Sequence, residues 1–158
     1  IGKGHTKGDA IVWMPKEKIL FSGDLVEDGT APYCGDAYFT EWPETLEKLR
    51  AFGADKLVPG RGEAMNSPAE VDRAIATTAG FLRDMREIVE AGVKDGKSLK
   101  TVYHETHDVL QPKYGEWVIF DHCLPFNVSR CFDEMSGIVD PRIWTTERDI
   151  EMWKDIEV

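Results

Sequence analysis

The chain has 158 residues and a formal net charge of −10, with 19 Lys and Arg against 29 Asp and Glu. Its length can bury a real core, and its 42% hydrophobic content is typical of a globular protein. Because an acidic surface repels phosphate backbones, we expect no nucleic-acid partner. We also expect no membrane partner, since there is no apolar run of roughly 18 residues.

Cysteine usage bears on the compartment. The three cysteines show no CxxC spacing, which indicates free thiols rather than a disulfide framework. Free thiols favour a reducing compartment, so the cytoplasm is expected ahead of the periplasm.

A glycine-framed turn and a β-hairpin open the chain. Residues 4–9 (GHTKGD) contain too much glycine for a helix or strand and predict a tight loop around His5. Two apolar runs at 10–14 and 19–22, separated by PKEK, predict antiparallel strands, and Asp24 follows the second. Because a hairpin returns its ends to one side, we expect His5 and Asp24 to lie together. An imidazole and a carboxylate so placed can bind a divalent ion such as zinc.

The middle of the chain predicts a loop, a helix and a strand. Residues 25–40 have no clean periodicity and predict a long loop, whose aromatic residues are expected to cap the core rather than line a pocket. Residues 42–52 have apolar side chains at helical spacing. Residues 56–59 predict a short strand that leads into a Pro-Gly-Arg-Gly turn containing Arg61.

The rest of the chain predicts helices only. A capping box at Ser67 and Glu70 opens a long helix that ends near Gly92. Pro125 is expected to kink or break a later helix. Further helices are predicted at 98–110, at 114–137 and from 146 onward. Strands followed by helices suggest one sheet-and-helix unit at 1–96 and a helical extension at 97–158 packed on it.

The three turns GHTKGD, FSGD and PGRG occur in an order that resembles the metallo-β-lactamase fold superfamily, which includes glyoxalase-II-like hydrolases. The resemblance covers residues 2–65. It implies an α/β fold: half of an αββα sandwich, with short antiparallel strands and then helices, followed by a helical C-terminal extension. It further implies that His5 binds one metal ion and that Asp24 bridges two.

Arg61 departs from the family pattern, which has histidine in the third turn. A guanidinium has no lone pair to give and therefore cannot bind zinc. We expect a one-metal site in which Arg61 acts as a substitute cation, pairs in bidentate fashion with Asp24 and anchors an anionic substrate. The alternative is that Arg61 points away and is inert. Zinc is the expected ion, with iron or manganese as alternatives.

The family's first metal motif, His-x-His-x-Asp-His, is absent from this sequence, which has four histidines. A catalytic zinc site needs three protein ligands, and this chain offers two, so the site is incomplete. We therefore expect the C-terminal half of a larger metallohydrolase, completed by a missing N-terminal half or by a partner chain.

The activity implied by the resemblance is hydrolysis of an ester, thioester or lactam-like bond in a small-molecule substrate. Metal-bound hydroxide would attack, with Asp24 and Arg61 as catalytic residues. The alternative is a non-catalytic scaffold or binding module derived from the same fold. The resemblance also implies that the helical extension either closes the substrate cleft or mediates a homodimer, and these alternatives stay open.

Several other polar residues have open roles. Asp9 either orients the His5 loop from behind or stabilises its turn. His104 and His107, at i and i+3, are expected on a solvated helix face, and His122 is expected to be buried. Arg130, like Arg142, either grips a carboxylate or ties helices together.

Overall fold

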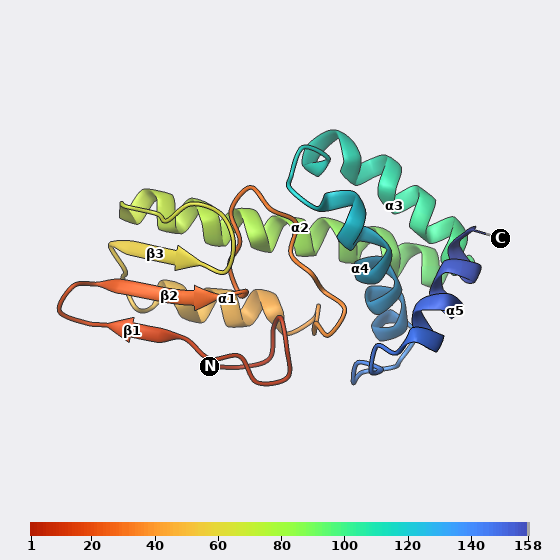
Figure 1. The fold of residues 1–158 in the computed structure, drawn as a ribbon, viewed down its shortest axis with the longest axis horizontal. Coiled ribbons are helices and arrows are strands. Elements are labelled where there is room, and N and C mark those ends of the chain that lie inside the picture. The colour runs from red at the N-terminus through yellow and green to blue at the C-terminus, as the bar shows by residue number, and fades with distance from the viewer. Residues whose placement is uncertain (158) are drawn as a thin grey trace.

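The computed structural model describes residues 1–157 as a mixed α/β fold, with a three-stranded sheet and five helices (Figure 1). The strands are β1 (Val12–Met14), β2 (Ile19–Gly23) and β3 (Lys56–Pro59). Strands β1 and β2 form the predicted antiparallel hairpin. Strand β3 pairs parallel to β2, which corrects the expectation of antiparallel strands alone. The pairing is parallel because a helix between the two strands carries the chain back to its starting end.

The five helices lie close to their predicted positions. They are α1 (Trp42–Arg50), α2 (Pro68–Lys94), α3 (Leu99–Tyr114), α4 (Phe120–Met135) and α5 (Thr146–Glu157). The predicted cap of α2 is present, since the Ser67 side chain accepts a hydrogen bond from the Glu70 amide. The Glu70 carboxylate in turn accepts from the Asn66 amide, 2.7 Å away.

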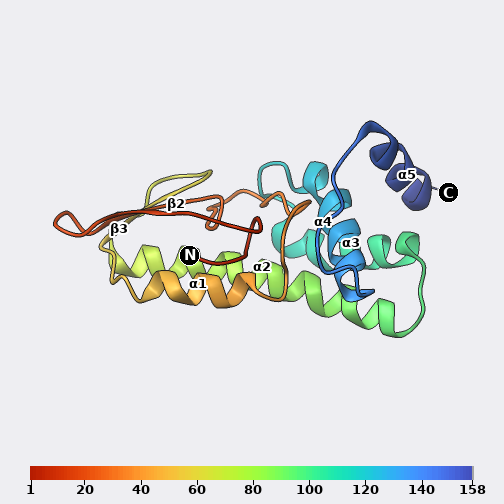
Figure 2. The same ribbon diagram turned by 90° about the horizontal axis from the view of Figure 1, so that it is seen from below.

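Helices α1 and α2 cover one face of the sheet (Figure 2). Leu20 and Leu57 are fully buried, in agreement with this cover. On alternate positions Val12, Met14 and Phe21 remain exposed, with 61% of Val12 open to solvent. The sheet therefore has helices on one side only, as in half of a sandwich.

Helices α3 and α4 pack on the second half of α2, and α5 packs on α3 and α4 (Figure 1). Two prolines lie inside helices: Pro112 in α3 and Pro125 in α4. Pro125 therefore does not break the helix, and the alternative of a kink stays a prediction. Its ring leaves the Asp121 carbonyl without a helical partner, but Asp121 is exposed near the start of α4, where water can bind that oxygen. No helix among residues 1–157 is long and apolar enough to cross a membrane.

The long loop predicted at 25–40 contains no helix and no strand segment. It is nevertheless largely buried, with Leu25, Val26 and Phe39 at 1% exposure or less. Its aromatic residues Tyr38 and Phe39 join the interior, as expected. A domain boundary at residue 96 falls in the turn between α2 and α3 and stays a prediction.

Candidate metal site

The His5 loop is closed by its own polar groups. The Asp9 carboxylate accepts hydrogen bonds from the Thr6 amide (3.1 Å) and the Thr6 hydroxyl (2.7 Å). Asp9 therefore has the turn-stabilising role. Gly4 lets the loop approach the interior, because a side chain there would meet Leu25 and Trp42 at 2.7 and 3.1 Å.

The structure brings His5 and Asp24 together, as the hairpin predicts. His5 Nε2 lies 3.9 Å from Asp24 Oδ2, with 16% of the His5 side chain and 38% of the Asp24 side chain exposed. Asp24 follows Gly23, which adopts φ +53° and turns the chain at the end of β2. A side chain at Gly60 would collide with the Asp24 carboxylate and with its backbone, so only glycine allows the two turns to touch.

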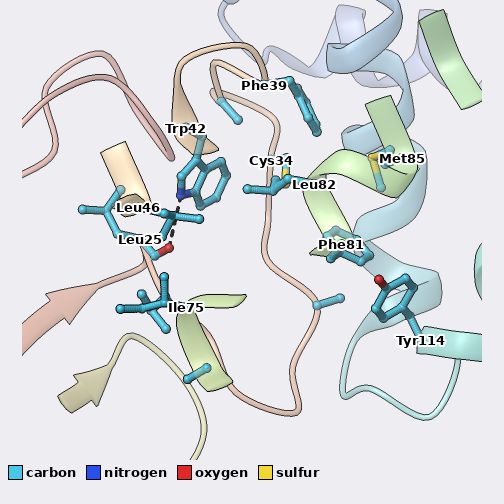
Figure 3. Packing of buried hydrophobic residues seen from close by; sticks show 14 of the residues in the cluster. Leu25, Cys34, Phe39, Trp42, Leu46, Ile75, Phe81, Leu82, Met85 and Tyr114 are labelled. Carbon is cyan, nitrogen blue, oxygen red and sulfur yellow. Dashed lines mark hydrogen bonds between the residues drawn. The ribbon is translucent and has the colours of Figure 1, made fainter. Parts of the chain in front are cut away.

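Trp42, the first residue of α1, contacts the His5 ring and the backbone of Leu25, the residue after Asp24; Figure 3 shows the Trp42–Leu25 hydrogen bond. Its ring meets the His5 ring edge-on, with centroids 5.6 Å apart and an interplanar angle of 77°. Its indole N–H donates to the Leu25 carbonyl at 3.1 Å, directly after Asp24. Since Trp42 is fully buried, it fixes the imidazole and the Asp24 turn relative to each other.

Arg61 pairs with Glu27, and no bond to Asp24 is formed among the described residues. Arg61 Nη1 donates to Glu27 Oε1 at 2.5 Å. The predicted bidentate Arg61–Asp24 pair is therefore wrong, because the buried Glu27 carboxylate takes the guanidinium instead. The Arg61 side chain is 41% exposed and that of Glu27 1% exposed, so the ion pair reaches from the interior to the surface.

The Glu27 carboxyl is electrostatically unusual. The pKa of Glu27 is raised to about 7, chiefly by burial; Arg61 lowers it and the nearby Asp24 charge raises it, and that value includes both effects. Its second oxygen, Oε2, is buried without a hydrogen-bond partner among residues 1–157. Its backbone is held by α2, because the Thr78 hydroxyl donates to the Glu27 carbonyl at 3.2 Å.

The donor set fits part of a zinc shell. Two ligands bound to one zinc ion at about 2.1 Å in a tetrahedral arrangement lie roughly 3.4 Å apart, close to the 3.9 Å between His5 Nε2 and Asp24 Oδ2. Within residues 1–157, however, no group of three or more His, Cys, Asp or Glu side chains is arranged to hold an ion. The chain thus supplies two donors of suitable chemistry and spacing.

The remaining histidines lie away from this site. His104 is exposed on α3, as expected, and its neighbour His107 lies 3.6 Å from Asp121 of α4. His122 is exposed on α4, so the prediction of a buried side chain is wrong. The apolar residues of α4 face inward, and His122 falls on the other side. All three cysteines are buried and free.

Sequence reasoning missed Glu27 and Trp42 as site residues. Glu27 follows the apolar pair Leu25-Val26, three residues after Asp24, and an acidic residue at the end of a buried run is a signal that could have found it. Trp42 enters the sequence prediction only as the first residue of the helix at 42–52. Nothing in the local sequence indicates that its ring contacts His5.

The family-model match to known proteins covers the N-terminal part of the chain. The family model described as metallo-beta-lactamase superfamily matches residues 1–61. The metallo-beta-lactamase type 2 of Bacteroides fragilis is 41% identical over 68 residues, covering 40% of this chain and 27% of that protein. The metallo-beta-lactamase type 2 of Bacillus cereus is 42% identical over 67 residues, covering 39% of this chain and 26% of that protein.

A solved metallo-beta-lactamase from Pontibacter korlensis is 30% identical, with a TM-score of 0.44, and the match covers 52% of this chain and 38% of that one. The matched region spans about a quarter of the length of the two curated relatives. The family-model match at residues 1–61 contains the His5 loop, the hairpin and the Asp24 turn. Residues 1–61 are therefore the part of the chain that is similar to the metallo-β-lactamase superfamily.

Proposed function

We propose that this chain is the C-terminal portion of a metal-dependent hydrolase that cleaves an ester, thioester or lactam-like bond. The observation that carries the proposal is the 3.9 Å approach of His5 Nε2 to Asp24 Oδ2 within the segment that matches the family. The remaining ligands would come from a part of the protein outside this chain or from a partner chain.

In this proposal His5 and Asp24 hold the ion. A bound zinc ion would lower the pKa of a water molecule and polarise the substrate carbonyl. Trp42 keeps the imidazole oriented through its edge-on ring contact, and Gly60 leaves room for the Asp24 carboxylate. The Asp24 side chain, 38% exposed, remains open to a substrate.

We further propose that the site takes one ion. Arg61 offers no lone pair, and its guanidinium is held by the buried Glu27 carboxylate. The guanidinium carries a permanent positive charge, which the ionised Glu27 carboxylate offsets. The exposed side of the guanidinium also gives an anionic group of a substrate a place to bind.

Metal content of the protein that carries this chain tests both proposals. We expect zinc to be lost in H5A and in D24N and retained in the control H104A, which changes an exposed histidine elsewhere. R61H restores a nitrogen ligand and should take up a second ion. Two tightly bound ions in the unmodified protein would overturn the one-ion proposal.

Hydrolysis of a chromogenic β-lactam, a thioester and an ester then identifies the bond class. Turnover should fall with the zinc content across the same variants. If the unmodified protein holds no more zinc than H5A and cleaves none of the three, the hydrolase proposal fails.

A non-catalytic binding module is the second candidate. It is supported by the Glu27–Arg61 ion pair, in which the third turn offers a cation and no metal ligand, and by the two-donor set of the described residues. For this candidate we expect no zinc and no turnover, but unchanged folding of H5A and D24N.

A further inference from the structure

We propose that helix α4 positions His5 for metal binding by holding the loop on which the His5 turn rests. The inference rests on the proposed function, and it concerns side chains in the helical extension, beyond the segment that matches the family. Three polar residues of α4 form what we call the loop-facing set: Asn127, Arg130 and Glu134. They are spaced three and four apart, so they share one face of the helix.

The loop at 25–40 creates the need for such a set. It is buried but has no helix or strand of its own, so its backbone amides and carbonyls need partners elsewhere. Asn127 supplies two of them. Its side-chain oxygen accepts from the Cys34 amide at 2.7 Å, and its side-chain nitrogen donates to the Pro32 carbonyl at 2.8 Å.

Arg130 binds the middle of the loop. It is fully buried, and its Nε donates to the Ala37 carbonyl at 2.8 Å. Its two other nitrogens donate to the carbonyls of Ile138 and Val139, and one of them also donates to Glu134. All three nitrogens therefore have partners, which is the condition for burying a guanidinium.

Glu134 binds the end of the loop. One carboxylate oxygen accepts from the Phe39 amide at 3.0 Å and from Arg130 at 2.9 Å. The other accepts from the Thr40 amide at 2.9 Å and from the Thr40 hydroxyl at 2.8 Å. Each oxygen therefore faces two donors, and only a carboxylate can satisfy all four.

Tyr38 connects the loop at 25–40 to the His5 turn. It lies between the bonded residues Ala37 and Phe39, and its amide donates to the Gly4 carbonyl at 2.9 Å, immediately before His5. Its carbonyl accepts from the amide of Trp42, whose ring orients the imidazole.

Asp140, which follows α4, adds a second connection to the same loop. Its carboxylate accepts from the Tyr38 hydroxyl at 2.8 Å and from Lys7 Nζ at 3.3 Å. Lys7 is two residues after His5, so the His5 turn is held on both sides by groups that the helical extension fixes. The loop-facing set are positioning residues, since they act on His5 through Tyr38.

The variant E134Q tests the proposal. Either orientation of the amide points an NH₂ group at a backbone N–H, that of Phe39 or that of Thr40, so this end of the loop should come free while the side-chain shape is kept. In zinc-free protein we expect amide hydrogen exchange of residues 4–9 to become about tenfold faster. Zinc affinity, measured by competition with a chelator, should fall by a similar factor.

Two further variants keep the test decisive. V89A opens a cavity in α2, outside this network, and is the control for a general loss of stability. At a matched fall in thermal stability it should leave both measurements unchanged. T40V removes only the hydroxyl bond, and it should show a smaller change in the same direction if E134Q does not fold.

The two measurements separate this inference from the proposed function. Unchanged exchange of residues 4–9 in E134Q and T40V would overturn the positioning role. An equal change in V89A would also overturn it, because the effect would then follow from stability alone. If the unmodified protein binds no zinc, the proposed function fails, while hydrogen exchange still decides whether α4 holds the His5 turn.

Discussion

Replacement of Gly60 by alanine offers the sharpest test of the site geometry. A Cβ atom at this position would lie 2.8 Å from the Asp24 amide nitrogen and 2.9 Å from its Cα, and it would overlap the carboxylate. Real Cβ atoms do not come this close to backbone, so one of the two turns must move. Because β2 and β3 pair at Gly23 and Pro59, just before these turns, the movement should displace the Asp24 side chain.

The expected cost of G60A is that of overpacking a closely packed site, about 1–3 kcal/mol in the free energy of unfolding. For a chain of this length, 2 kcal/mol corresponds to a fall of about 4–8 °C in Tm. The matched control is G8A, also in a turn of the site, because a Cβ atom there meets nothing within 4 Å. It should change stability by no more than about 0.5 kcal/mol.

Urea and thermal unfolding of the two variants measure this difference directly. Zinc affinity gives a second readout, which should fall in G60A and hold in G8A. Equal stability of G60A and the unmodified protein would refute the claim that these turns touch. A stability loss without any change in zinc affinity would show that Asp24 keeps its place.

Three other outcomes are expected. The pKa of Glu27 is raised, chiefly by burial, from 4.5 to about 7, so the Glu27 contribution to the free energy of unfolding is complete below pH 4.5 and is lost as the pH rises toward 7. Urea unfolding of E27Q between these two pH values should show no such fall in the free energy of unfolding. D133N should destabilise the fold by about 3 kcal/mol in urea unfolding, because Asp133 is 6% exposed and accepts hydrogen bonds from both Arg142 and Arg148; a loss below about 1 kcal/mol would contradict a buried pair. The three cysteine thiols, all buried, should resist a thiol reagent in the native protein and react fully in denaturant, and fast native labelling would show that this interior opens.

Local signals in the sequence predicted most of the elements. The PKEK turn between two apolar runs predicted the hairpin, and Ser67 with Glu70 predicted the start of α2, because both depend on neighbours within a few residues. The approach of His5 to Asp24 followed from the hairpin alone. Whether the two side chains bind an ion stays a prediction.

Long-range contacts explain what could not be predicted. Helix α3 was expected to end at Leu110, but it runs through Pro112 to Tyr114, whose hydroxyl donates to Asp84 of α2 at 2.8 Å. The predicted Arg61–Asp24 pair followed from the resemblance, which puts Arg61 near the position of a second metal ion. The better partner, Glu27, lay in a loop whose burial depends on packing against α2 and α4. No periodicity in the loop sequence reports that burial.

Helix α2 packs against both the sheet unit and the helical extension. Its 27 residues span about 40 Å, and its first half packs on α1 and β3 while its second half packs on α3 and α4. Phe81, at the middle of α2, meets the Tyr114 ring edge-on and stacks on the Trp117 ring. Truncation after residue 96 would expose the apolar face of α2 that α3 and α4 cover, so we expect the truncated chain to aggregate. We expect the full chain to unfold in one cooperative transition.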